Sequence, residues 1–206
     1  MQRLNELLEN QVIKNYYTLG DQNQIYHAEH NLNHALRVMN YCKSIATQLK
    51  LTATDIENVC IAALLHDVGA SKFGKENHAE RSFEIAKNFT DNDKILNAIR
   101  YHSNGHASDY GYILTLADKL DICQNRVTEL GKTIPGVRQF LHITSLSIEI
   151  NDSNLLIKCI SDQQIDWQEL NEYYFVKKIF NAIKNFANYF ELKYQVLVDN
   201  IAWQPQ

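Results

Sequence analysis

The stretch Cys60–Gly69 constrains the fold of this chain most strongly. Its apolar run from Ile61 to Leu65 has to be buried, so the His66 and Asp67 side chains that follow are carried into the interior or to the floor of a cleft. A buried carboxylate without a partner costs on the order of several kcal/mol, and its usual partners are an opposite charge, hydrogen bonds or a metal ion. An isolated pair of this kind is most often structural, with the aspartate capping a helix and the histidine satisfied in the core.

Other residues of the same chemistry show that the pair is not isolated. His30 and His34 stand one helical turn apart, so they share a helix face, and Asp118 interrupts an otherwise apolar run. With His66 and Asp67 they offer imidazoles and carboxylates, a mixed set that suits Mn, Fe, Zn, Ni or Co better than Ca. Mg²⁺ is an alternative, and the number of ligands leaves open one ion or two.

The order of a histidine, a His-Asp pair and a distant aspartate resembles the HD superfamily of metal-dependent phosphohydrolases. The resemblance covers roughly residues 26–130 and implies a helical bundle with four metal ligands: His34, His66, Asp67 and Asp118. Relatives with two metals recruit further histidines before the last aspartate, and His78 and His102 match those places, with His106 a weaker match. His102 is followed by Ser103, where many such relatives have a second histidine.

The segment His30–Val38 is similar to a stretch of the cyclic-nucleotide phosphodiesterases, an HD branch. The likeness makes His30 a candidate general acid that protonates the leaving oxygen; the alternative is a capping or solvent-exposed histidine. Two departures from HD branches count against cyclic nucleotides and guanosine tetraphosphate as substrates. Residues 68–71 lack the further histidine of those phosphodiesterases, and residues 70–72 lack the acidic pair of the guanosine-tetraphosphate hydrolases, another HD branch.

The predicted activity is hydrolysis of a nucleotide or another small phosphate ester. A bound metal ion lowers the pKa of its water from about 15.7 toward 7 and polarises the phosphoryl oxygen, and Asp67 would hold that nucleophile. Nearby cations that could contact the substrate phosphate, each by itself a common surface residue, are Lys72, Lys75, Lys119 and Arg126. Two alternatives stay open: a mixed-valent di-iron oxygenase of the HD type, and a metal- or nucleotide-binding regulatory module with little turnover.

Length and composition bound the remaining possibilities. A chain of 206 residues favours one domain, and the low number of breakers, two prolines and seven glycines, favours helices. The net charge of −4 gives no broad basic surface, so we expect no extended nucleic acid as a partner. We interpret the four scattered cysteines as reduced thiols of the core: Cys42, Cys60, Cys123 and Cys159. The charged N-terminus and the absence of a long apolar run predict a cytosolic protein that does not associate with membranes.

The predicted fold class is all-α: an HD-domain helical bundle with a small C-terminal antiparallel β-hairpin and a long C-terminal helix. Within a single domain 1–206 we expect the metal-binding core at 26–130, the hairpin at 138–162 and the helix at 166–200. Alternating apolar residues on both sides of Asn151–Asn154 predict the hairpin. Helical spacing of apolar residues predicts the helix. Its apolar face would pack in the core or form a dimer surface. A homodimer would form through this helix or the hairpin. The spacing also predicts a first helix over 1–19 and a loop over 69–75.

Overall fold

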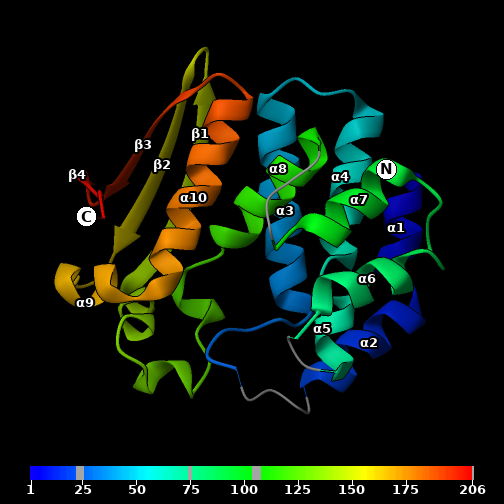
Figure 1. The fold of residues 1–206 in the computed structure, drawn as a ribbon, viewed down its shortest axis with the longest axis horizontal. Coiled ribbons are helices and arrows are strands. Elements are labelled where there is room, and N and C mark those ends of the chain that lie inside the picture. Colours follow the sequence, from blue (N-terminus) through cyan, green and yellow to red (C-terminus); the bar gives the residue numbers. More distant parts are fainter. Residues whose placement is uncertain (22–25, 74–75, 104–107, 206) are drawn as a thin grey trace. The chain divides into compact units, whose positions relative to one another are not determined.

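The computed structural model describes residues 1–21, 26–73, 76–103 and 108–205, without the side chains of residues 20, 21 and 71–73. It divides into two compact units (Figure 1), and each is described by itself. The first unit comprises Met1–Gln24 and His30–Asp118, and the second comprises Ile25–Glu29 and Lys119–Gln206. Among the helices of the described ranges, none combines the length and the apolar character needed to cross a bilayer.

Helices make up the regular structure of the first unit, as far as its residues are described. They are α1 (Gln2–Leu8), α2 (Gln11–Asp21), α3 (Leu32–Gln48), α4 (Ala53–Leu65), α5 (Val68–Phe73), α6 (His78–Ala86), α7 (Asp93–Tyr101) and α8 (Asp109–Lys119). Helix α4 contacts α1, α3 and α7, and its apolar run from Ile61 to Leu65 is 0% exposed. The predicted burial of that run is therefore confirmed, and α4 delivers the His-Asp pair into the interior.

Capping residues set where α3 and α4 begin. The Asn31 side chain accepts a hydrogen bond from the His34 N–H at 3.0 Å, and the Thr52 hydroxyl accepts one from the Asp55 N–H at 3.1 Å. Such caps satisfy amide groups that have no partner within the helix. The cap on α3 places His34 in its first turn.

Two local predictions for the first unit were wrong. The helix expected over 1–19 is broken, because the Asn10 side chain accepts from the Val12 N–H at 2.9 Å and so starts a new helix, α2. The expected loop after Asp67 begins with helix α5. Gly69 belongs to that helix and brings it against α6, since an added Cβ would lie only 2.5 Å from the backbone nitrogen of Ser82.

The second unit contains a four-stranded sheet in the order β1-β2-β3-β4, with helix α10 along one face (Figure 1). Its elements are η1 (Gln124–Arg126), η2 (Gly131–Thr133), η3 (Val137–His142), β1 (Ile143–Asn151), β2 (Asn154–Ser161), α9 (Trp167–Glu172), α10 (Tyr174–Tyr189), β3 (Lys193–Val198) and β4 (Ile201–Ala202). Strands β1 and β2 are antiparallel with Asn151 opposite Asn154, so the predicted hairpin is present. Strand β3 runs parallel to β2 and antiparallel to β4.

The sheet corrects the predicted fold class, because the hairpin is part of a larger mixed sheet and not an appendage to an all-α fold. The helix expected to reach residue 200 ends at Tyr189. Glu191 adopts a φ of 55°, and the Leu192 N–H donates to the Ala187 oxygen at 2.7 Å, which closes the last turn. Residues 193–198 then form a strand, because their apolar side chains also alternate with the period of a half-buried strand.

A short segment from the N-terminal half of the sequence belongs to the second unit. Ala28 forms an antiparallel bridge with Val127, and the Glu29 N–H donates to the Arg126 oxygen at 2.9 Å. Residues 26–29 are thereby fixed to the chain that follows α8, directly before His30.

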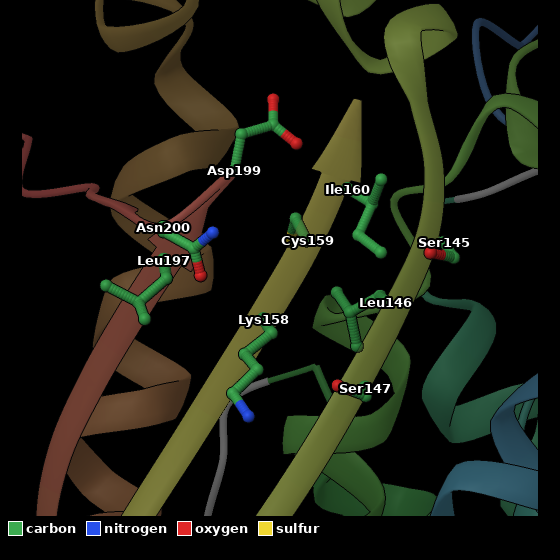
Figure 2. A pocket seen from close by; sticks show the side chains of 9 residues that line it. All are labelled: Ser145, Leu146, Ser147, Lys158, Cys159, Ile160, Leu197, Asp199 and Asn200. Atoms are coloured by element: carbon green, nitrogen blue, oxygen red, sulfur yellow. The ribbon is translucent and has the colours of Figure 1, made fainter. Parts of the chain in front are cut away.

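The sheet of the second unit carries a hollow of about 430 Å³, and Figure 2 shows the side chains that line it, contributed by β1, β2, β3 and the turn after β3. Its charged side chains already have partners. Lys158 pairs with Glu149 at 2.9 Å, and Asp199 accepts from the Ser161 N–H at 2.9 Å. The hollow contains none of the site residues predicted from the sequence.

Candidate metal centre

The helix ends of the first unit carry the residues expected at a metal site. His34 lies in the first turn of α3, His66 caps the C-terminal end of α4 and is followed by Asp67, His78 begins α6, His102 caps α7, and Asp118 lies near the end of α8. With His30, which precedes α3, their ligand atoms form three overlapping groups: His30, His34 and Asp67; His34, His66 and Asp118; and His66, Asp67 and His102. The structure thus brings together residues that are far apart in the sequence.

The first cluster consists of His34, His66, Asp67 and Asp118. The Nε2 atoms of His34 and His66 are 3.3 Å apart, and each lies 3.5 Å from Oδ2 of Asp67. Oδ1 of Asp118 lies 3.3 Å from Nε2 of His34 and 3.9 Å from Nε2 of His66. Donor atoms around one tetrahedral ion with bonds of about 2.0–2.2 Å are roughly 3.3–3.6 Å apart. Four of the five distances lie in this range and the fifth, 3.9 Å between Asp118 and His66, is slightly longer, so the four residues fit one transition-metal ion.

The second cluster shares Asp67 with the first. The Nε2 atoms of His78 and His102 are 2.9 Å apart, and they lie 3.4 Å and 3.7 Å from the other carboxylate oxygen, Oδ1 of Asp67. One carboxylate therefore offers one oxygen to each cluster. This arrangement fits a pair of ions with Asp67 between them.

Backbone carbonyls fix the orientation of two of the imidazoles. The Nδ1 atom of His66 lies 2.7 Å from the Ala63 oxygen, and that of His102 lies 2.7 Å from the Ile99 oxygen. A carbonyl oxygen only accepts, so both Nδ1 atoms carry the hydrogen and both Nε2 atoms present a lone pair. Histidines that bind metal ions are commonly held in this way.

Oδ1 of Asp67 is buried and accepts no hydrogen bond from any residue in the described ranges. Leaving a buried acceptor without a partner costs about 1–3 kcal/mol, and more when the group is charged. The lone pairs of His66 and His102 also point into this region. A divalent cation would satisfy all of these atoms, so the residues present fit a metal ion.

The pKa values favour the protonation states that metal binding needs. Burial lowers the pKa of His66, and it lowers that of His102 well below the usual value, which keeps both rings neutral. Burial alone would raise the pKa of Asp67, but the surrounding histidines, including the hydrogen bond from His30, outweigh it and hold that pKa well below its usual range. The centre therefore presents two neutral imidazoles, those of His66 and His102, and an ionised carboxylate.

His30, the candidate general acid, lies against the first cluster. It is 8% exposed, and its Nδ1 atom is 2.8 Å from Oδ2 of Asp67. Because the carboxylate is ionised, Nδ1 carries the hydrogen and donates it. His30 is therefore neither an exposed residue nor a helix cap, since Asn31 caps α3.

The structure describes the side chains of two of the four candidate phosphate-binding cations. Lys119 and Arg126 belong to the second unit, where Lys119 Nζ lies 5.8 Å from the centroid of the Phe175 ring. Arg126 is buried and donates from Nη1 to the Asp121 oxygen at 3.0 Å. The side chain of Lys72, and all of Lys75 and His106, lie outside the described residues.

Two polar side chains near the centre were missed by sequence reasoning. The Tyr17 hydroxyl donates to the Leu64 oxygen at 2.7 Å, and the Thr115 hydroxyl donates to the His102 oxygen at 2.9 Å. Thr115 gave a signal, because it is a polar residue in an otherwise apolar helix; the tyrosine gives none. Ser103, noted in the sequence only as a departure from the family pattern, places its Oγ beside the second cluster.

Comparison with known protein families agrees with this geometry. Residues 31–123 match the family model of the HD domain. No curated protein matches the chain. HD domains bind divalent metals, and proteins of this family are commonly metal-dependent phosphohydrolases. The match begins just before His34 and ends after Asp118, so the chain carries an HD domain over residues 31–123, which confirms the resemblance seen in its sequence.

Proposed function

We propose that this protein is a metal-dependent phosphohydrolase that acts on a nucleotide or another small phosphate ester. The observation that carries the proposal is the buried Oδ1 of Asp67, which lies 3.4 Å and 3.7 Å from Nε2 of His78 and His102 and receives no hydrogen bond from the described residues. When bound, a divalent ion supplies a water of lowered pKa and polarises the phosphoryl oxygen.

The residues that would hold the ion are those of the first cluster, His34, His66, Asp67 and Asp118. All four are buried, so solvent does not compete for these ligand atoms. Oδ2 of Asp67 would also orient the nucleophile, because it lies between the two histidines and accepts the hydrogen of His30. The Ala63 carbonyl prevents the His66 ring from turning away.

His30 would move the proton that the leaving oxygen needs. Its Nδ1–H donates to Asp67, so Nε2 stands on the opposite side of the ring. A ring protonated on both nitrogens would pass the Nε2 hydrogen to the leaving group, and Asp67 would keep the ring in position. This role of His30 is supported by the hydrogen bond and by the resemblance of the His30–Val38 segment.

The substrate is proposed to be small because the chain offers no broad basic surface, with its net charge of −4. Local cations would have to contact the phosphate, and Lys72, Lys75 and Lys119 remain the proposed residues. Arg126 is the weakest of the four candidates, because its guanidinium is buried and bonded to the backbone of its own unit.

A pair of variants in α8 tests the proposal. Asp118→Asn keeps the shape of the side chain but removes a charged ligand, whereas Asp109→Asn makes the same change in the first turn of the same helix. Metal content is measured on the purified proteins, and phosphate release is measured over nucleoside mono-, di- and triphosphates, cyclic nucleotides and sugar phosphates. We expect Asp118→Asn to lose metal and turnover together, and Asp109→Asn to keep both.

Three results would contradict the proposal. Full phosphate release by Asp118→Asn would show that the reaction does not use this centre. Iron in the purified protein together with oxygen uptake, without phosphate release from any substrate, would favour the di-iron oxygenase. Bound metal and nucleotide with neither reaction would favour a regulatory module.

A further inference from the structure

Ser103 lies beside the two histidines of the second cluster. Its Oγ atom is 3.3 Å from Nε2 of His78 and 3.3 Å from Nε2 of His102, and these two nitrogens are 2.9 Å apart. Oδ1 of Asp67 approaches the same two nitrogens from 3.4 Å and 3.7 Å. Two imidazole nitrogens, a hydroxyl and a carboxylate oxygen thus converge on one small region.

Hydrogen bonds among the described residues leave one atom of this group, Oδ1 of Asp67, without a partner. Nε2 of His102 presents a lone pair, because Nδ1 donates to the Ile99 oxygen. The Ser103 hydroxyl has one hydrogen to share between the two nitrogens, and Oδ1 of Asp67 accepts none from the described residues. A cation would be attracted by Oδ1 of Asp67, by the Ser103 oxygen and by the lone pair of His102.

We infer that Ser103 completes a second ion site with His78, His102 and Oδ1 of Asp67, and that its hydroxyl makes this site weaker and more selective for Mn²⁺ and Mg²⁺ than the first. The inference rests on the proposed function, since it takes the centre to be metal-dependent. It concerns the serine that stands where many relatives with two metals carry a histidine.

The ligand sets explain why the two sites differ. Both clusters share the Asp67 carboxylate, but the first also has the carboxylate of Asp118, whereas the second has a neutral hydroxyl in its place. Replacing an imidazole by a hydroxyl lowers the preference for Zn²⁺, Ni²⁺ and Co²⁺ and favours ions that take oxygen ligands. Serine hydroxyls bind Mg²⁺ in other proteins.

Solvent exposure also makes the second site weaker than the first. His34 and His66 are 0% exposed, whereas Ser103 is exposed and the His78 side chain is 12% exposed. Solvent therefore reaches the second cluster more easily, and its ion should exchange faster. The first ion would stay with the protein during purification, and the second would be taken up according to the concentration of Mn²⁺ or Mg²⁺.

The test follows ion binding without using turnover. Protein stripped by a chelator is titrated with Mn²⁺, and the electron paramagnetic resonance spectrum reports free ion, bound ion and coupling between two close ions. The wild type is compared with Ser103→Ala, with Ser103→His and with Ser147→Ala, which removes an exposed hydroxyl from β1 in the second unit. Circular dichroism confirms that each variant is folded.

We expect the wild type and Ser147→Ala to bind two ions with different affinities and to show the coupled signal. Ser103→Ala should keep the first ion and bind the second about tenfold more weakly or worse, in the range typical of lost metal-site contacts. Ser103→His should strengthen the second site for Co²⁺ and Zn²⁺ relative to Mn²⁺.

Three outcomes would overturn the inference. Ser103→Ala with two ions of unchanged affinity would show that the hydroxyl is not a ligand, and an unchanged preference in Ser103→His would refute its effect on selectivity. A wild type that never binds more than one ion would remove the second site, while a one-ion phosphohydrolase would stand. Two bound ions without phosphate release would instead refute the proposed function and leave the assignment of Ser103 intact.

Discussion

Replacing Gly69 by alanine tests how closely the packing of α5 on α6 controls the centre. The new Cβ would lie 2.5 Å from the backbone nitrogen of Ser82 and 2.7 Å from Cβ of Arg81, whereas ordinary contacts begin near 3.4 Å. Helix α6 would therefore have to move by about 1 Å. His78 is the first residue of α6, and a displacement of that size exceeds the roughly 0.5 Å within which a site has to be held.

The expected change in the free energy of unfolding combines opposing effects. Alanine gains about 0.8–1 kcal/mol in helix propensity over glycine, but overpacking costs about 1–3 kcal/mol. The hydrogen bond from the Gly69 N–H to Ser82 Oγ, 2.9 Å long, contributes about another 0.5–1.5 kcal/mol and would be weakened. We expect a net loss of roughly 1–3 kcal/mol by urea unfolding of the chelated protein.

Ion binding separates a shift of α6 from general destabilisation. Gly69→Ala should bind its second Mn²⁺ about tenfold more weakly and keep the first, because the first cluster contains no residue of α6. Ser82→Ala is the matched control, since it removes the same hydrogen bond without adding volume, and it should keep both ions. If Gly69→Ala were as stable as the wild type and bound both ions equally well, the argument from close packing would be refuted.

Two further predictions concern a proton donor and an ion pair. His30→Ala should retain metal, while its turnover on an alkyl or ribose ester falls about a hundredfold or more and its turnover on a para-nitrophenyl ester falls much less. His34→Ala should instead lose metal. Equal loss of turnover on both esters by His30→Ala would contradict the role of His30 as the general acid. In the second unit, Arg138 and the Gly136 N–H hold the pKa of Glu169 at about 2, against a usual 4.5. Because this pKa is depressed in the folded state, the contribution of Glu169 to stability is complete above about pH 4.5 and is lost as the pH falls toward 2. The stability difference between wild type and Glu169→Gln, measured by urea unfolding, should shrink over this range; a difference independent of pH would contradict it.

The first unit was largely predictable because its signals are local. Apolar periodicity and the caps Asn31 and Thr52 fix where α3 and α4 lie, and a histidine or aspartate at the end of a buried helix points to chemistry whatever the rest of the fold. Gly69 shows the limit of such signals. A glycine after an apolar helix usually marks the end of that helix. Here a glycine is required at position 69 because α5 lies too close to Ser82 for a larger side chain, and no local sequence pattern predicts that contact.

The sheet of the second unit was only half visible in the sequence. The hairpin has alternating residues and a turn at Asn151–Asn154, so it was found. Strand β3 pairs in parallel with β2, although α9 and α10 separate the two strands in the sequence. The few apolar residues of β3 fit a helix as well as a strand. Ser103 was noted in the sequence only as a departure from a family pattern. Its contact with His78 and His102 is visible only in the structure.

The anchoring of residues 26–29 limits how this protein can be divided. The chain passes from the first unit to the second, returns at His30, and leaves again after Asp118. A fragment ending at Asp118 would retain His34, His66, Asp67 and Asp118 but would lose Val127 and Arg126, which hold residues 28 and 29. A chimera that transplants residues 30–118 alone would therefore leave behind the chain with which the peptide leading into His30 is paired.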